Sequence, residues 1–357
     1  MDELVDLTRQ LVAIPSHEDE SAAGDAIETW LREETDGDVS RDAAGNVIAR
    51  KGEGPSLALV GHHDVVPPDD SQLDSDGGYV VEEGDGRLYG RGTADMKGAV
   101  AAAMLAFRDA TPAGELVFAS FVGEEVGGEG ARAAIDDGIV PEFAIVGEGS
   151  TNYSTPGVTD VVIAHKGRRA VTITAHGSAA HASEPAAGEN AIYRATDAVD
   201  VVRNLQAPTV DVFGESVSGS VVVTEIEGGS AWNVIPERCT VTVDERTVPG
   251  ERADLGQVEG IEGVEWTVDQ DLPPMRCADE AFAEGVRAAA ESVQTGSPAL
   301  VSKPHATDAG WLAGAGTTCV ICGPAEQGEA HTATESVSID VLERCYRIYL
   351  ASAERLP

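Results

Sequence analysis

The sequence contains few positively charged residues, and lysine is nearly absent. Its 357 residues include 24 Lys and Arg against 62 Asp and Glu, which gives a formal net charge of -38. Phosphate backbones repel a chain of this sign, so a nucleic-acid partner is not expected. Such self-repulsion is screened in concentrated salt, where the Debye length is about 3 Å at 1 M. The composition is therefore typical of a halophile's cytosolic enzyme, and a solvated acidic surface in an ordinary host is the alternative.

Long apolar runs and a disulfide framework are absent as well. No apolar run reaches the roughly 18 residues of a membrane helix, and Met1-Asp2-Glu3 opens an acidic amphipathic segment instead of a basic signal peptide. We therefore expect a cytoplasmic protein with no membrane partner. The five cysteines are an odd number. Cys319 and Cys322 lie in an apolar run that reads as a strand, where residues three apart face opposite sides, so we expect core residues.

Short apolar runs alternate with helical patterns in the first part of the chain. Helical spacing is found over residues 2–14, 20–34 and 98–108, and strand-like runs over 47–50, 56–60, 115–122 and 142–146. This alternation predicts an α/β fold, with a mainly parallel sheet covered by helices on both faces. The P-loop, the G-x-S-x-G elbow and the G-x-G-x-x-G fingerprint are absent, which argues against nucleotide-dependent and serine-hydrolase chemistry.

The pattern changes near residue 167. Strands predicted at 170–175, 220–226, 238–243 and 264–268, with a helix at 190–205, indicate a small α+β module. The α/β character returns after residue 271. We therefore expect a catalytic domain of residues 1–166 and 273–357, interrupted by an inserted domain of residues 167–272.

Histidines and acidic residues follow the predicted strands where these end. His62 comes after one strand, the pair Glu124-Glu125 after another and Glu148 after a third. Open α/β sheets bind ligands beyond the carboxyl ends of their strands. Imidazole and carboxylate ligands without cysteine suit a catalytic zinc ion more than a structural one. A single pair of such residues more often lies on a solvated surface. The prediction of a metal site therefore depends on the order of the whole set along the chain.

With their flanking residues, these segments resemble the M20 family of metallopeptidases and deacylases, over nearly the whole chain. The matching segments are Gly61 to Pro67, Tyr89 to Gly98, Gly123 to Glu125, Gly147-Glu148, and Gly323-Pro324 leading to Ala330-His331-Thr332. The resemblance implies two Zn²⁺ ions, with Co²⁺ or Mn²⁺ as alternatives. It implies that His62 and Glu148 bind one ion, that Glu125 and His331 bind the other, and that Asp95 bridges them. Asp64 would orient His62, and Glu124 would be the general base.

The inserted segment also resembles the family. Gly177 to Ser183 is similar to its dimerisation motif, which implies a homodimer in which His181 helps to hold the oxyanion in the partner's site. Asn233 and Arg246 match substrate-holding segments. The basic cluster 165–169, which includes Arg168 and Arg169, either faces an anionic acyl group or forms a hinge between acidic domains.

The implied reaction is removal of an acyl group from an N-acyl amino acid, with N-succinyl-diaminopimelate or N-acetylornithine as the first candidates. Two departures from the desuccinylase pattern leave the substrate open: Gly149-Ser150 replaces a usual proline, and Lys303 to Asp308 lacks a glycine-rich run. A carboxypeptidase or dipeptidase is the alternative, and an acidic binding protein without catalysis is a remote one. We expect His63 to be structural or exposed. Thr307-Asp308 either borders the site or is an ordinary helix cap.

Overall fold

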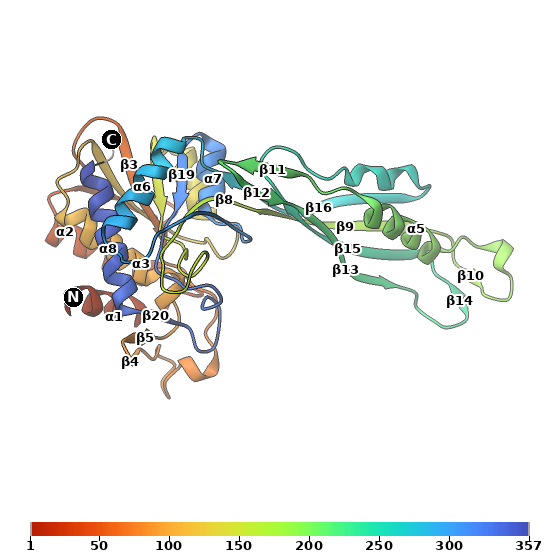
Figure 1. Cartoon of the computed structure of the whole chain (residues 1–357). Coiled ribbons are helices and arrows are strands. Elements are labelled where there is room, and N and C mark those ends of the chain that lie inside the picture. The colour runs from red at the N-terminus through yellow and green to blue at the C-terminus, as the bar shows by residue number, and fades with distance from the viewer. Residues whose placement is uncertain (1, 356–357) are drawn as a thin grey trace. The chain divides into compact units, whose positions relative to one another are not determined.

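A computed structural model describes residues 2–355 (Figure 1). The chain divides into two compact units. Unit 1 comprises Met1–Ala164, Arg276–Lys303 and Thr307–Pro357 within these limits, and unit 2 comprises His165–Met275 and Pro304–Ala306. The sequence had placed the two borders after residues 166 and 272. None of the helices in the described part of the chain has the length and apolarity that a membrane span requires.

Unit 1 contains most of the strands. They are β1 (Asp38–Arg41), β2 (Val47–Lys51), β3 (Ser56–His62), β4 (Glu82–Gly84), β5 (Arg87–Tyr89), β6 (Glu115–Phe121), β7 (Phe143–Val146), β8 (Val161–His165), β17 (Met275–Arg276), β18 (Leu300–Lys303), β19 (Thr318–Ile321) and β20 (Ser336–Ser338). Two of these, β8 and β17, reach across the border with unit 2 by one residue each. The helices of unit 1 are α1 (Asp2–Val12), α2 (Ser21–Glu34), η1 (Asp70–Gln72), η2 (Thr93–Lys97), α3 (Gly98–Asp109), α4 (Glu129–Asp136), α6 (Glu280–Ser292), α7 (Asp308–Ala315) and α8 (Ile339–Arg355).

A large mixed sheet forms the centre of unit 1, and the predicted α/β class is confirmed. Its strand order is β1-β2-β6-β3-β7-β19-β8-β17, and β18 also pairs with β8. The middle strands β6, β3, β7 and β19 are parallel, and antiparallel pairs flank them. Strands β3 and β6 are buried at every position after their first residue. Burial on both faces explains why they read as continuous apolar runs. Cys319 and Cys322 are buried at this centre, as expected.

Helices cover the sheet. The alanine-rich helix α3 lies against β3 and β6 and packs with α1 and α8, whereas α7 lies against β7 and β19 and packs with α4. In α3, ten of twelve residues are buried, because small side chains allow helix and sheet to approach closely. This packing fixes the carboxyl ends of β3, β6 and β7, where the candidate site residues begin.

Unit 2 is an α+β module, as the sequence predicts. A four-stranded antiparallel sheet has the order β13-β15-β9-β16, from β13 (Ser220–Gly228), β15 (Arg238–Thr247), β9 (Gly167–His176) and β16 (Val264–Leu272). Helix α5 (Ala191–Asn204) packs on one face through alanines and valines. The remaining elements are β10 (Ala180–His181), η3 (Pro185–Ala187), β11 (Thr209–Val212), β12 (Glu215–Ser218), β14 (Val234–Ile235) and η4 (Leu255–Gly260).

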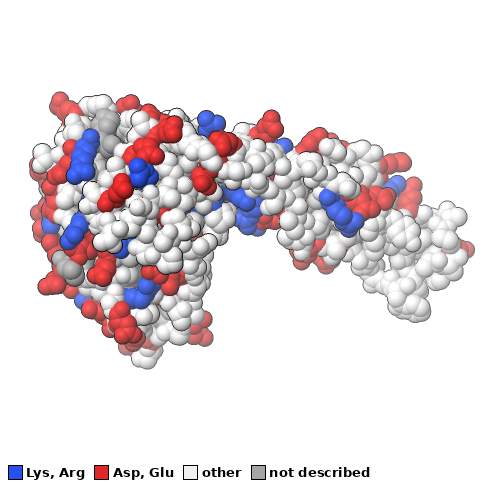
Figure 2. All heavy atoms as spheres, viewed as in Figure 1, with Lys and Arg blue, Asp and Glu red and all other residues white. Residues whose placement is uncertain are grey.

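Acidic side chains are spread over the visible surface instead of being gathered in one patch (Figure 2). The part of unit 2 around β10 and β14 is the exception and shows few charged side chains (Figures 1 and 2).

Candidate metal centre

His62 is the last residue of β3, and Asp64 contacts the Nδ1 side of its ring. The ring is buried, and its Nδ1 lies 3.1 Å from the backbone oxygen and 3.2 Å from Oδ1 of Asp64. A partner on Nδ1 fixes the tautomer and turns Nε2 toward the open side, as metal-binding histidines require. The two oxygens of Asp64 also accept the backbone N–H groups of Glu124 and Glu125, at 3.2 and 3.0 Å. Asp64 therefore contacts three candidate site residues, His62 through its ring and Glu124 and Glu125 through their backbones.

Asp95 lies between two histidines. Its Oδ1 is 3.2 Å from Nε2 of His62, and its Oδ2 is 3.2 Å from Nε2 of His331. Each carboxylate oxygen thus faces a different imidazole nitrogen. Asp95 comes from η2, beyond β5, and His331 from the loop before β20, so the structure brings together residues far apart in the sequence. A carboxylate placed in this way could hold a cation on each side.

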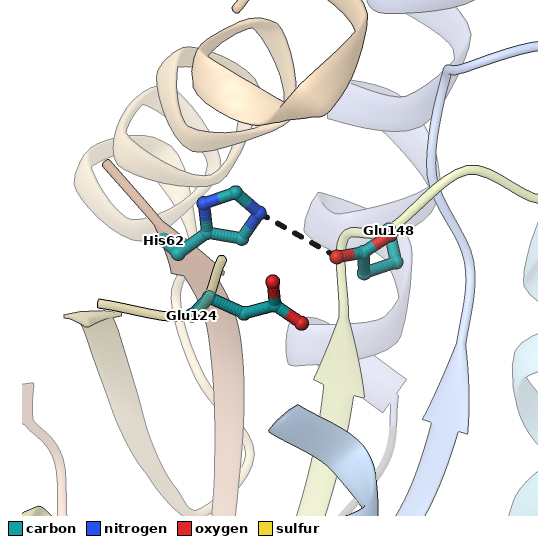
Figure 3. Close-up of side chains that lie close together, drawn as sticks. All are labelled: His62, Glu124 and Glu148. Atoms are coloured by element: carbon teal, nitrogen blue, oxygen red, sulfur yellow. Dashed lines mark ion pairs between the residues drawn. The ribbon is translucent and has the colours of Figure 1, made fainter. Parts of the chain in front are cut away.

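Glu124 and Glu125 follow β6 and point to different partners. Oε1 of Glu125 lies 2.9 Å from Nε2 of His331, which places Glu125 with His331 and Asp95. Glu124 lies instead near His62 and Glu148 (Figure 3), and atoms of these three residues fall within 4.8 Å of one another. Burial raises the pKa of Glu124 well above its ordinary value, and the carboxylates of Asp308 and Glu148 add to this. A buried carboxyl with a raised pKa can hold a proton during a reaction.

Glu148 follows β7 and has two partners. Its Oε1 faces Nε2 of His62 at 3.5 Å (Figure 3), and its Oε2 accepts a hydrogen bond from Nζ of Lys303 at 2.9 Å. Burial disfavours the charge on Lys303, but Glu148, Tyr153 and Asp95 together outweigh this and keep the pKa of Lys303 above its usual range. Lys303 therefore occupies one carboxylate oxygen of Glu148 and leaves the other directed at His62.

The donor set fits divalent metal ions. Hydrogen bonds to Asp95 and Glu125 raise the pKa of His331 to about 10, so this imidazole would be protonated at neutral pH if no other cation were near. Two groups of three residues place one donor atom each within 4.8 Å of one another: His62, Glu124 and Glu148, and His62, Asp95 and Glu125. A cluster with so many carboxylates is stabilised by a positive charge. A bound metal ion would supply this charge and displace the proton from His331. Nitrogen and oxygen donors of this type suit zinc and similar ions.

Lys303 and Glu335 contribute to this centre and were not predicted from the sequence, whereas for Asp308 the sequence left two interpretations open. Lys303 could have been noticed, because it is one of few lysines in so acidic a chain. Thr307 is the N-cap of α7, as one interpretation expects, and both oxygens of the buried Asp308 lack a hydrogen-bond partner within the described chain. Burial raises the pKa of Asp308 to about 7. Glu335 lies beneath Asp95 and accepts its backbone N–H at 3.1 Å.

His63, next to His62, does not belong to the donor set. It is buried, and its Nδ1 lies 2.9 Å from Oγ of Ser120. Burial lowers the pKa of His63 to about 3, so the ring is neutral. This matches the structural role expected for it.

Two further candidates, His181 and Asn233, lie side by side in unit 2. Strands β10 and β14 pair His181 with Val234, and the oxygen of Asn233 accepts the N–H of Ala182 at 2.9 Å. The His181 ring is exposed and touches Oγ of Ser183 at 2.7 Å.

The candidate arginines lie at one end of the sheet in unit 2. Arg168 and Arg246 are directly paired across β9 and β15, and both donate to the carboxylate of Asp244. Arg169 points to the opposite face, since successive strand residues alternate. There it binds the buried carboxylate of Glu245 at 2.6 Å and stacks on Trp266. Within the cluster 165–169, Arg168 therefore lies on the same face of the sheet as Arg246, and Arg169 lies on the other face.

Comparison with known proteins gives a consistent result. The model of peptidase family M20/M25/M40 matches residues 58–355. Acetylornithine deacetylase from Myxococcus xanthus is 32% identical over 84% of this chain and 81% of its own length. Succinyl-diaminopimelate desuccinylase from Acidiphilium cryptum is 34% identical over 63% of this chain and 59% of its own length.

Solved structures share the fold at lower identity. Aminopeptidase PepT from Bacillus cereus superimposes with a TM-score of 0.82 at 20% identity, covering 99% of this chain and 97% of that one. The YXEP protein of Bacillus subtilis, described as a dinuclear metal-binding peptidase of family M20, gives a TM-score of 0.72 at 18% identity, over 99% of this chain and 96% of the other. The family match extends over most of the chain and includes every donor of the centre. The chain belongs to peptidase family M20/M25/M40 and is a metal-dependent hydrolase.

Proposed function

We propose that this chain is a cytoplasmic di-zinc amide hydrolase that removes the acyl group from an N-acyl amino acid. The observation that carries the proposal is Asp95, whose two oxygens face His62 and His331 separately. In this scheme His62 and Glu148 hold one ion and Glu125 and His331 the other. Zinc, when bound, lowers the pKa of water and stabilises the developing oxyanion.

The protein's own residues supply positioning and proton transfer. Glu124 lies near His62 and Glu148, the proposed ligands of one ion. Lys303 pairs with Glu148 and His331 pairs with Glu125, but neither pairs with Glu124. We propose that Glu124 takes the proton of the attacking water and passes it to the leaving amine. Asp64 keeps Glu124 in place by accepting its backbone N–H. General acid–base catalysis of this kind contributes about 10²–10⁴-fold to a rate.

We also propose that the enzyme acts as a homodimer, because the candidate residues of unit 2 form two separate groups. Arg168 and Arg246 lie at one end of β15, while His181 and Asn233 lie beyond its other end, which begins at Arg238. Strand residues rise by about 3.3 Å each, so the groups are roughly 25–30 Å apart. A small substrate cannot reach both groups in one chain. His181 and Asn233 would therefore serve the partner subunit's site.

An open strand edge in unit 2 suits such a dimer. Strand β13 pairs only with β15 inside the sheet, and it exposes Val222 and Ile226 to about half of their full area (52% and 50%). A groove of about 350 Å³ between α5 and β13 is lined mainly by valines. An uncovered, apolar strand edge tends to pair with another chain.

The substrate is decided by a direct comparison of rates. Purified protein with Zn²⁺ in molar KCl would be given N-succinyl-diaminopimelate, N-acetylornithine and a dipeptide at matched concentrations. The curated relatives named above favour one of the two acyl amino acids, and Arg168 with Arg246 could bind an anionic succinyl group. Activity confined to dipeptides would overturn the deacylase proposal.

A peptidase is the second candidate, because the solved structures that share this fold include an aminopeptidase and human carnosine dipeptidase 1. The two candidate functions share the metal centre and differ in the group on the carbonyl side of the scissile amide, which is a simple acyl group in one and an aminoacyl group in the other. A broad rate profile over several dipeptides, with slow turnover of both acyl amino acids, would favour the peptidase.

A further inference from the structure

Glu335 connects the segments that carry Asp95 and His331. Its carboxylate is fully buried, and Oε1 accepts the backbone N–H groups of Gly92, Ala94 and Asp95 at 2.9, 2.9 and 3.1 Å. Its Oε2 binds Nη1 of Arg91 at 2.6 Å. One side chain thus satisfies four donors from five consecutive residues.

The backbone of Glu335 is tied to both segments too. Its N–H donates to the oxygen of Thr332, next to His331, at 3.3 Å, and its oxygen accepts the N–H of Gly90 at 3.0 Å. Strands β20 and β5, which pair Ser336 with Tyr89, bring the two segments together as far as this point. After Tyr89 the chain is no longer paired with β20. The backbone N–H groups of Gly92, Ala94 and Asp95 donate to the Glu335 carboxylate instead.

The segment after Tyr89 has little regular hydrogen bonding of its own. Gly92 has a positive φ of 87°, and a side chain there would meet Val65 at 2.8 Å, so the loop conformation is narrowly defined. A loop of this kind keeps its shape only if its N–H groups find acceptors. His331 also has a positive φ, of 63°, a conformation that a non-glycine residue holds only when its surroundings impose it.

We propose that Glu335 is a positioning residue for the metal centre, which sets Asp95 and His331 at the spacing that the two metal positions need. The inference rests on the metal binding proposed above. Partners behind metal ligands typically contribute 10–100-fold to metal affinity. The position that uses both Asp95 and His331 should depend on Glu335 more than the position of His62 and Glu148, whose backbones are fixed by parallel strands.

The test is a titration of metal-free protein with Co²⁺, followed by calorimetry and by visible absorption. Glu335→Gln keeps an acceptor oxygen but loses the charge and opposes Arg91 with an amide N–H. Glu329→Gln is the matched control, because Glu329 lies in the same loop and binds Ser336 and Arg87 but none of residues 91–95. We expect Glu335→Gln to weaken one of the two binding steps by 10–100-fold and to change the Co²⁺ spectrum, with the control unchanged in both.

Activity against metal concentration gives a second readout. Saturating metal should restore kcat of Glu335→Gln with KM unaltered, since the substrate contacts are intact. Glu335→Leu should lose more metal affinity than Glu335→Gln. If Glu335→Leu does not fold, the result for Glu335→Gln alone tests the inference. If Glu335→Gln binds Co²⁺ in two steps with wild-type affinities and a wild-type spectrum, the inference is overturned but the proposed function is not. A wild-type protein that binds no Co²⁺ would overturn the proposed function and this inference with it.

Discussion

Nζ of Lys303 lies 2.9 Å from Oε2 of Glu148, and both side chains are buried. Removing one member of a buried ion pair typically costs about 3–5 kcal/mol, because the other charge is left without a partner. Metal ions at the centre would supply part of the missing positive charge.

Lys303→Met should therefore destabilise the metal-free protein by about 3–5 kcal/mol and the metal-loaded protein by less. Thermal unfolding with and without Zn²⁺ measures both. Lys51→Met is the control, because Lys51 donates to the backbone oxygens of Arg108 and Ala110, in contacts that involve no candidate metal donor. Equal losses with and without metal in Lys303→Met would contradict the prediction.

Glu124→Gln should lower kcat by about 10²–10⁴-fold while the protein still binds metal. The amide cannot accept a proton, but it retains the size of the carboxyl group. Steady-state kinetics and a metal assay on the same preparation test this. The exposed Glu129→Gln, at the start of α4, should behave as wild type. Full activity in Glu124→Gln would mean that another group moves the proton.

His181→Ala and Glu124→Gln chains should complement each other when mixed. If His181 serves the partner's site, each heterodimer has one site with both residues intact. Random mixing then restores about a quarter of the wild-type activity. Each variant alone, carried through the same unfolding and mixing, is the control. Mixtures no more active than the separate variants would show that His181 does not act in trans.

If the proposed dimer forms through β13, Val222→Glu with Ile226→Glu should convert it into monomers, because like charges on an exposed strand edge oppose edge-to-edge pairing. Light scattering during gel filtration gives the mass, and the activity should fall with it. Val268→Glu, at an exposed position on the opposite edge strand β16, is the matched control. Dimers that persist in the double variant would place the interface elsewhere.

Stability should rise steeply with KCl, because the formal charge is -38. Between 0.1 and 1 M salt the Debye length falls from about 10 to about 3 Å, which screens most surface repulsion. Chemical unfolding by urea at several KCl concentrations gives the dependence, and sucrose, which carries no charge, controls for solute exclusion. A free energy of unfolding that does not depend on KCl would reject the halophilic interpretation.

The sequence revealed the residues of this centre that lie at strand ends. His62 and Glu148 directly follow apolar runs, and neighbouring parallel strands necessarily bring their carboxyl ends together. The family resemblance added Asp95 and His331, whose segments carry no strand pattern strong enough to place them.

Lys303, Asp308 and Glu335 could not be found in this way. Two of them act through partners that are distant in the sequence: Glu335 binds Asp95, and Lys303 binds Glu148, across 240 and 155 positions. A buried acid and a surface acid look alike in an acidic chain, and only the fold shows which carboxylates have lost contact with water. For that reason the sequence left Asp308 between two interpretations.

The distribution of the donors along the chain has a consequence for how the enzyme is made. His62 to Glu148 are synthesised first, then the whole of unit 2, and only afterwards His331 and Glu335. A nascent chain therefore carries an incomplete, strongly anionic half-centre throughout the synthesis of unit 2. Capture of the proposed metal ions can be completed only near the end of translation, so full loading with metal would mark a chain in which the last donors of unit 1 have been made and folded.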